Sequence, residues 1–289
     1  MKPFLLQLLF LCSMSIHVFS SSVSSDIIET CHFEEIVSYA SPDALVLVDI
    51  DDTLLVPVQT LGADVWFLYQ LQKNKHERDP LDKTLAQWEA IRHLTRMKIV
   101  EPGSEKIVSA LQKKNIRVMG LTTQGLALAT RTIQQLLDHQ IDLSKTAPSQ
   151  KDHYFNNGQG VLYRKGVLFT SGTPKGPALR KLLDLMGMSP KKIVFINDKK
   201  THLLDVATAA KELGIEFIGL RYSYSDERVR NFLPELAEVQ FHHSNFSHIL
   251  SDEEAAKILQ EQKAQNGSHK GVSPLADFSA KSRSKFGGG

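Results

Sequence analysis

The sequence predicts an α/β fold on a mostly parallel central sheet, with a helical insertion after the first core strand and a small β-hairpin insertion. Three observations predict it. Short aliphatic runs recur along the chain, as in parallel strands that are buried on both faces. Amphipathic helical segments separate these runs, which is the pattern of βαβ units. Several runs end in acidic or hydroxyl side chains, and the carboxyl ends of parallel strands meet at one edge of a sheet, where ligands bind.

The first aliphatic run, Ala44–Ile50, ends in an acidic cluster that continues to Thr53. Strand side chains repeat every second residue, so Asp49 and Asp51 share one face of the strand end. Two carboxylates so placed repel each other, and each is costly to bury alone, which favours a bound cation or a shared proton. We interpret the pair as a Mg²⁺ site beside a nucleophile. The alternative is a strand end followed by an acidic turn.

The N-terminal residues predict a secretory signal peptide over 1–20. Lys2 supplies a positive start, Phe4–Met14 form a short apolar run, and Val18–Ser21 offer small residues for cleavage. The run is too short to remain as a membrane span, although a retained N-terminal anchor is the alternative. We therefore expect an exported protein, periplasmic or secreted, with no stable membrane span after cleavage.

Composition limits the possible partners. A net charge of +2 and 23% charged residues are ordinary for a globular protein, so no nucleic-acid partner is predicted. After signal cleavage Cys31 is the one cysteine left, so no internal disulfide can form. The predicted stability therefore comes from the hydrophobic core.

Residues 57–97 predict a helical insertion directly after the acidic strand. Helical spacing runs from Asp64 to Met97 and is interrupted between Lys73 and Asp79, ahead of Pro80. Such a unit is placed to cover the strand end as a lid. The alternative is a helical hairpin packed on the core, with Trp66 and Trp88 as its own core residues.

Two further segments offer groups for an anion. The strand Ile116–Leu121 ends in Thr122 and Thr123 before a glycine-containing turn and a helix, a natural place for a donor to phosphate oxygens. Lys175 directly precedes a helix that Gly187 ends, so its ammonium and the helix dipole point to one place.

The remaining chain supplies the other predicted elements. The strand Lys192–Ile196 ends in Asn197 and Asp198, and Glu216–Leu220 is the last core strand. Other predicted elements are an approach segment over 21–42 lying over the sheet edge, a short strand at Ile141–Leu143, a hairpin within 151–172, and helices over Ser104–Lys114, Leu126–His139, Thr201–Leu213, Asp226–Glu238 and Asp252–Gln262. The chain is predicted to be disordered from Ala264. A histidine cluster could bind metal, but its spacing favours structural or solvated side chains: His242, His243 and His248.

The order of these segments resembles the haloacid dehalogenase-like (HAD) superfamily. Its motifs are an acidic strand end, a hydroxyl strand end, a lysine before a helix and a second acidic strand end, all within 44–220. The insertion pattern is similar to that of secreted or effector-type bacterial HAD-like proteins. The resemblance implies a Rossmann-like core over 21–56 and 98–250, a cap insertion over 57–97, and a C-terminal helix and tail over 251–289.

The resemblance also implies roles for individual residues. Asp49 would be the nucleophile and Asp51 the general acid and base. Thr122, Thr123 and Lys175 would hold the phosphate oxygens, while Thr53 would steady the loop. Mg²⁺ would be bound by Asp49, the main-chain carbonyl of Asp51, and Asp198.

The chain departs from the family pattern near its fourth motif. Asn197 stands where some members carry an acid, and His202 and Leu203 occupy the usual places of a second acid, for which Asp205 is the possible substitute. The expected function is Mg²⁺-dependent hydrolysis of a phosphomonoester, with a phosphorylated small molecule or phosphorylated protein side chain as substrate. The alternatives are a phosphotransferase and an impaired scaffold that acts as a secreted binding protein; a dehalogenase is disfavoured.

Overall fold

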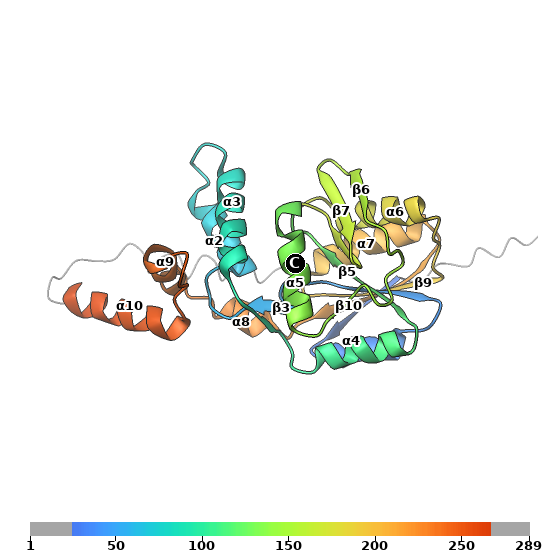
Figure 1. Ribbon diagram of the computed structural model, residues 1–289, viewed down its shortest axis with the longest axis horizontal. Helices are drawn as coiled ribbons and strands as arrows, with labels where there is room; N and C mark the ends of the chain where they lie inside the picture. Colours follow the sequence, from blue (N-terminus) through green and yellow to red (C-terminus); the bar gives the residue numbers. More distant parts are fainter. Residues whose placement is uncertain (1–24, 267–289) are drawn as a thin grey trace, which may run out of the picture.

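The structure, a computed structural model, describes residues 25–266, which form a large α/β lobe and a smaller helical lobe (Figure 1). The predicted signal peptide and the chain beyond Asn266 lie outside the described residues. The main sheet has eight strands: β1 (Ser25–Thr30), β2 (Ala44–Val48), β5 (Arg117–Thr122), β6 (His153–Asn156), β7 (Gly160–Arg164), β8 (Val167–Phe169), β9 (Lys192–Asn197) and β10 (Glu216–Tyr222). Their order is β1-β10-β9-β2-β5-β8-β7-β6.

Strand β2 lies near the middle of this sheet. It pairs in parallel with β9 on one side and with β5 on the other, and β1, β10 and β8 continue the parallel arrangement. All five residues of β2 are buried, as expected of a strand covered on both faces. The predicted α/β class with a mostly parallel sheet is therefore confirmed.

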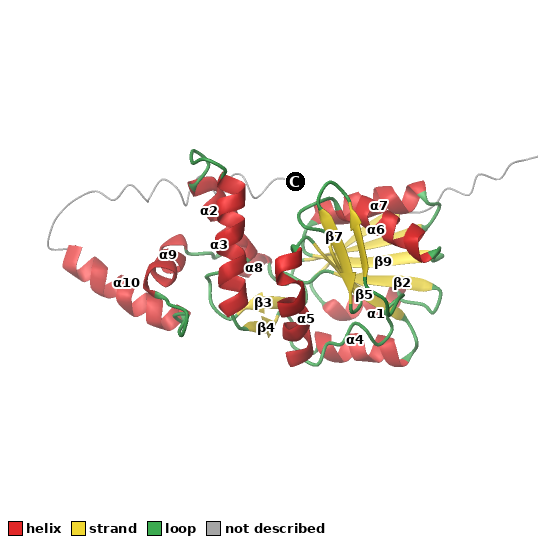
Figure 2. Ribbon diagram, turned by 45° about the horizontal axis from the view of Figure 1, so that its top comes forward, coloured by secondary structure: helices red, strands yellow, loops and turns green. Residues whose placement is uncertain are grey.

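Helices cover both faces of the sheet (Figure 2). One face packs against η1 (Phe33–Glu35), α1 (Ile36–Tyr39), α4 (Ser104–Lys113) and α5 (Ala129–Asp138), and the other against α6 (Lys175–Met186) and α7 (Lys200–Glu212). Alternate residues of β2 divide between these layers. Val46 and Val48 join the α4 and α5 layer, whereas Leu45 and Leu47 join the α6 and α7 layer. By this period of two, Asp49 continues the row that faces α6.

The smaller lobe combines the insertion with the C-terminal helices (Figure 1). The insertion contributes the antiparallel pair β3 (Leu55–Pro57) and β4 (Met97–Ile99) with helices α2 (Asp64–Lys73) and α3 (Pro80–Leu94). The C-terminal part contributes α8 (Asp226–Arg230), α9 (Pro234–His243) and α10 (Asp252–Asn266). Trp66 and Trp88 lie in the hydrophobic core of this lobe with Ala237 of α9.

This composite lobe differs from the predicted division of the chain. Residues 234–250 were expected with the α/β core but pack against the insertion instead. Gln240 accepts the main-chain N–H of Leu61, and Asp252 accepts that of Thr60, each at 2.8 Å. These polar contacts join segments far apart in sequence, which no local pattern reveals.

Several predicted elements were wrong in detail. The approach segment contains β1, which is the sheet edge itself rather than a segment lying over it. The predicted hairpin forms as β7 and β8, but β8 pairs with β5, so it extends the main sheet instead of standing apart. Ile141–Leu143 is a loop whose apolar side chains pack into the core.

Two C-terminal helix boundaries also differ from prediction. The single helix expected over Asp226–Glu238 is two helices, because Pro234 starts the second. Helix α10 continues to Asn266, past the predicted onset of disorder at Ala264. A 3₁₀ turn, η2 (Leu126–Leu128), precedes α5.

No helix within 25–266 is long and apolar enough to cross a membrane.

Gly176 allows α6 and α7 to approach closely enough to place Lys175. A Cβ built at Gly176 would lie 2.3 Å from the main-chain oxygen of Asp205. We predict that Gly176→Ala lowers the free energy of unfolding by about 1–3 kcal/mol, because backbone atoms must shift. Urea denaturation measures this effect.

Gly125→Ala is the matched control. Its added Cβ would meet only the end of the Glu89 side chain, at 3.0 Å, and Gly125 has a φ of −83° that alanine adopts freely. A loss of stability at Gly125 equal to that at Gly176 would contradict the close-approach explanation.

Candidate functional site

Three neighbouring strand ends form the candidate site. β2 ends at Val48, directly before Asp49, β5 ends at Thr122 and β9 ends at Asn197, and parallel pairing places these ends at one edge of the sheet. The main-chain N–H of Asp49 donates to Ile196 at 3.1 Å, so β2 and β9 remain paired up to the acidic residue.

The loops beyond β2 and β9 also contact each other. The hydroxyl of Thr53 accepts the main-chain N–H of Asp198 at 3.2 Å. Thr53 thereby steadies the relative position of the two acidic loops.

Lys175 reaches the site from the N-terminus of α6. Its nitrogen lies 2.8 Å from Oδ1 of Asp49, and the side chains are only 1% and 6% exposed. Burial lowers the pKa of Lys175, and Asp49 opposes this by stabilising the ammonium. An ammonium carries three N–H donors and Asp49 faces it with one oxygen, so donors remain for another acceptor.

The loop after β5 presents the two threonines. Thr122 is buried, and its hydroxyl accepts the main-chain N–H of Gln124 at 3.1 Å. Thr123 is partly exposed, and its main-chain oxygen accepts the N–H of Gly172. The structure thus brings the loop of Thr122 and Thr123 to the same edge of the sheet as Asp49.

Asp51 has both carboxylate oxygens engaged. Arg92 of α3 donates to Oδ1 at 2.6 Å, and Gln124 donates to Oδ2 at 2.7 Å. The Thr132 hydroxyl donates to the Gln124 carbonyl oxygen at 2.5 Å, which fixes the amide orientation. Burial raises the pKa of Asp51, and Arg92 opposes that effect.

Asp52 occupies a strained turn next to this pair. Its φ of 55° lies in the left-handed region, and Ser225 donates to its main-chain oxygen at 2.7 Å. Arg228 of α8 lies 3.3 Å from its carboxylate. Burial and the nearby Asp64 raise the pKa of Asp52 to about 7 despite Arg228. The C-terminal segment therefore holds the acidic loop in place.

Asp198 is the second acid at the edge. Burial raises its pKa well above the usual range, with Lys199 opposing. Its Oδ1 is buried without a hydrogen-bond partner. An unpaired buried carboxylate oxygen is costly, and a bound cation would compensate it.

Asn197, the last residue of β9, has a structural role. Its Oδ1 accepts the main-chain N–H of Lys199 at 2.7 Å, and its Nδ2 lies 3.4 Å from Nδ1 of His202. Burial and the nearby Lys175 lower the pKa of His202 to about 4, which keeps the ring neutral. An amide can both accept and donate here, whereas a carboxylate cannot.

Asp205 caps helix α6. Its Oδ2 accepts the main-chain N–H of Gly176 at 2.8 Å, so its carboxylate is committed to the helix that carries Lys175. The suggestion that Asp205 substitutes for a missing metal ligand is therefore not supported by its geometry.

The oxygen atoms at the edge fit a small hard cation. Asp49 and Asp198 offer carboxylates. Ile50 and Lys175 both contact Oδ1 of Asp49, and Oδ1 of Asp198 is buried without a hydrogen-bond partner. Mg²⁺ takes one or two carboxylates and keeps several waters, so two acids suffice. No group of three or more His, Cys, Asp and Glu side chains poised for a metal occurs in the described part of the chain.

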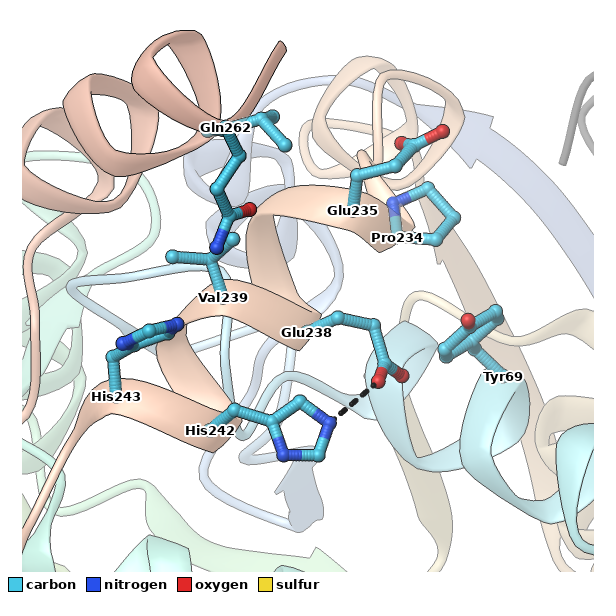
Figure 3. Close-up of a pocket in the computed structure, with 9 residues that line it drawn as sticks. Tyr69, Pro234, Glu235, Glu238, Val239, His242, His243 and Gln262 are labelled. Atoms are coloured by element: carbon cyan, nitrogen blue, oxygen red, sulfur yellow. Dashed lines mark ion pairs between the residues drawn. The ribbon is translucent and has the colours of Figure 1, made fainter. Parts of the chain in front are cut away.

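The histidines of the predicted cluster make separate contacts. Figure 3 shows His242 and His243 at a surface pocket between α2, α9 and α10, with the His242 ring directed toward Glu238. His242 lies 3.4 Å from Glu238, and His248 lies 3.0 Å from Glu254. The predicted structural or solvated role fits these separate contacts.

Sequence reasoning missed the charged partners that the insertion brings to the site. Arg92 pairs with Asp51, and Asp64 of α2 accepts from Lys199 at 2.6 Å. One sequence feature could have indicated this role for Arg92. It lies four residues after Trp88, so both side chains share the buried face of α3.

Fold and site together define an α/β protein with a mostly parallel sheet, whose central strand ends in buried acids facing one lysine. Residues 29–256 match the family described as "Protein of unknown function (DUF2608)", and the chain belongs to that family.

The chain is also similar to proteins of Chlamydia and Rickettsia. It is 24% identical over 261 residues to a Chlamydia trachomatis protein named "Putative outer membrane protein", covering 88% of this chain and 97% of that relative. A Chlamydia muridarum protein of the same name is 26% identical over 263 residues, covering 89% and 97%. An uncharacterized Rickettsia prowazekii protein is 22% identical over 259 residues, covering 83% and 92%. The chlamydial names are consistent with export.

We predict that Asp205→Ala destabilises the protein by about 1 kcal/mol and leaves Mg²⁺ affinity unchanged, because the carboxylate caps α6 rather than binding metal. Urea denaturation and Mg²⁺ titration calorimetry measure the two effects. A large loss of Mg²⁺ affinity with intact stability would show that Asp205 is a ligand after all.

Proposed function

We propose that the chain is a Mg²⁺-dependent phosphomonoester hydrolase of the HAD type that acts through an aspartyl-phosphate on Asp49. The observation that carries the proposal is the buried contact between Asp49 and Lys175. The two residues lie on separate elements, 126 positions apart. A buried ion pair of this kind often adds no net stability to a fold, so its presence favours a functional role. Their pairing leaves donors on the ammonium that suit the oxygens of a phosphoryl group.

The proposed chemistry assigns one step to each acid. An oxygen of Asp49 attacks phosphorus, and the bond to the ester oxygen breaks as that oxygen takes a proton from Asp51. Water then attacks the aspartyl-phosphate and gives its proton to Asp51, and the bond from phosphorus to Asp49 breaks. Lys175 and the threonine loop hold the non-bridging oxygens.

The residues that would hold Mg²⁺ are Asp49, Asp198 and the main-chain carbonyl of Asp51. The ion would supply positive charge against the phosphoryl oxygens. Substrates in keeping with this site are phosphorylated small molecules or phosphorylated protein side chains. The finer localisation, periplasmic or secreted after removal of residues 1–20, is part of the same proposal.

A second candidate is a catalytically impaired scaffold that serves as a secreted binding protein. Two observations favour it: both oxygens of Asp51 are engaged, and Asn197 stands in place of an acid. A phosphotransferase would use the same first step and differ only in the acceptor. Turnover assays with and without an acceptor alcohol distinguish the three.

We predict that Asp49→Asn lowers Mg²⁺-dependent hydrolysis of 4-nitrophenyl phosphate by about a thousandfold or more, because the amide cannot act as the nucleophile. Circular dichroism checks that the variant is folded. Asp43→Asn, which changes an acid on the surface before the same strand, is the control and keeps its activity. Retained turnover in Asp49→Asn would refute the assignment.

We also predict that Mg²⁺ raises the melting temperature of the wild-type protein and that chelator reverses the effect, because the ion binds only the folded state. In Asp198→Asn the Mg²⁺ effect is lost, while stability without metal is equal or higher, since a buried unpaired charge is removed. A wild-type melting temperature that does not respond to Mg²⁺ would contradict the metal site.

A further inference from the structure

The contact between Arg92 and Asp51 joins the helical insertion to the candidate nucleophile strand. Among the described residues of the insertion, Arg92 alone donates a hydrogen bond to the Asp51 carboxylate. Its side chain is 2% exposed. With Gln124 on the other oxygen, both oxygens of Asp51 already accept a hydrogen bond from a protein side chain.

Arg92 has little else to hold it in this position. Its Nη1 lies 3.4 Å from the main-chain oxygen of Gly62, a long contact, and its Nε is buried without a partner. The guanidinium carbon lies 4.9 Å from the centroid of the Trp88 ring. The guanidinium therefore makes one strong contact, with Asp51, and keeps an unsatisfied donor.

A second ion pair crosses between the same two units. Asp64, at the start of α2, accepts from Lys199, which directly follows Asp198. Burial would raise the pKa of Asp64, but Lys199 outweighs it and lowers the pKa. Asp49 and Lys175 are buried, and both ion pairs join the insertion to the loops that follow β2 and β9.

We propose that Arg92 is a positioning residue whose guanidinium changes partner, from the carboxylate of Asp51 to the phosphoryl group of the substrate. In the structure it keeps Asp51 fully engaged. A phosphoryl group entering the cleft offers three oxygens, which suit the planar fork of an arginine better than one carboxylate oxygen does. Its arrival draws the guanidinium away and frees Oδ1 of Asp51 for the leaving oxygen. The inference rests on the proposed phosphohydrolase function.

Trp88 provides a direct readout, because the guanidinium lies over its ring and the chain has two tryptophans. In a Trp66→Phe parent, Trp88 is the only tryptophan. Titration with inorganic phosphate at saturating Mg²⁺ should produce a saturable change in Trp88 fluorescence. In this parent, Arg92→Gln should abolish the change and weaken phosphate binding about tenfold or more. Arg92→Lys should fall between them, because it keeps the charge but not the fork.

Arg131→Gln is the matched control. Arg131 also links the core to the end of the insertion, because it donates to the main-chain oxygen of Thr95 at 3.2 Å. Its hydrogen bond goes to Thr95 and not to Asp51. It should keep the phosphate response of the parent. If Arg92→Gln does not fold, Arg92→Lys and the parent titration decide the question.

Two results would overturn the inference while the proposed function stands. One is a parent that hydrolyses 4-nitrophenyl phosphate and binds phosphate without any change in Trp88 fluorescence. The other is an Arg92→Gln variant that binds phosphate as tightly as the parent. A parent that neither hydrolyses the ester nor binds phosphate would instead refute the proposed function, and this inference with it.

Discussion

The burial of Lys175 against Asp49 is the interaction on which the arrangement of the site depends. It requires β2 to end next to the first turn of α6, and this in turn requires the close approach of α6 to α7 at Gly176. The parallel pairing of β2 with β9 and β5 then adds Asp198 and Thr122 at the same edge. An isolated buried charge would be expelled or neutralised, so each member of the cluster needs the others.

The second lobe depends on the same cluster of charges. Arg92 and Asp64 connect the insertion to the acidic edge, while Arg228 and Ser225 connect the C-terminal segment to Asp52. Helices α9 and α10 in turn fix the loop that enters the insertion. The smaller lobe is thus a composite unit, and both ion pairs and apolar contacts hold it over the acidic edge: Leu55 and Met97 join the main core, and Leu128 joins the core of the insertion.

Local pattern was sufficient for the α/β class and for most strands and helices, because buried parallel strands are apolar throughout and helices carry a 3.6-residue stripe. It also predicted that Asp49, Thr122, Lys175 and Asp198 lie near one edge of the sheet, since each ends a strand, directly follows one or opens a helix. It could not locate Arg92 as the partner of Asp51 or α9 as part of the insertion lobe, because both depend on contacts between distant segments. Strand β1 was missed for a related reason: it is a short edge strand whose apolar residues are Ile27 and Ile28 alone, and its pairing partner β10 is distant in sequence.

Covalent trapping tests the central claim most directly. The protein is mixed with an excess of 4-nitrophenyl phosphate and Mg²⁺, quenched in acid within the turnover time, digested and analysed by mass spectrometry. Our account predicts one phosphoryl group on the peptide that contains Asp49, located on that residue by fragmentation and released by hydroxylamine. Turnover without any phosphoryl group on Asp49, or with the group on a histidine or serine instead, would contradict it.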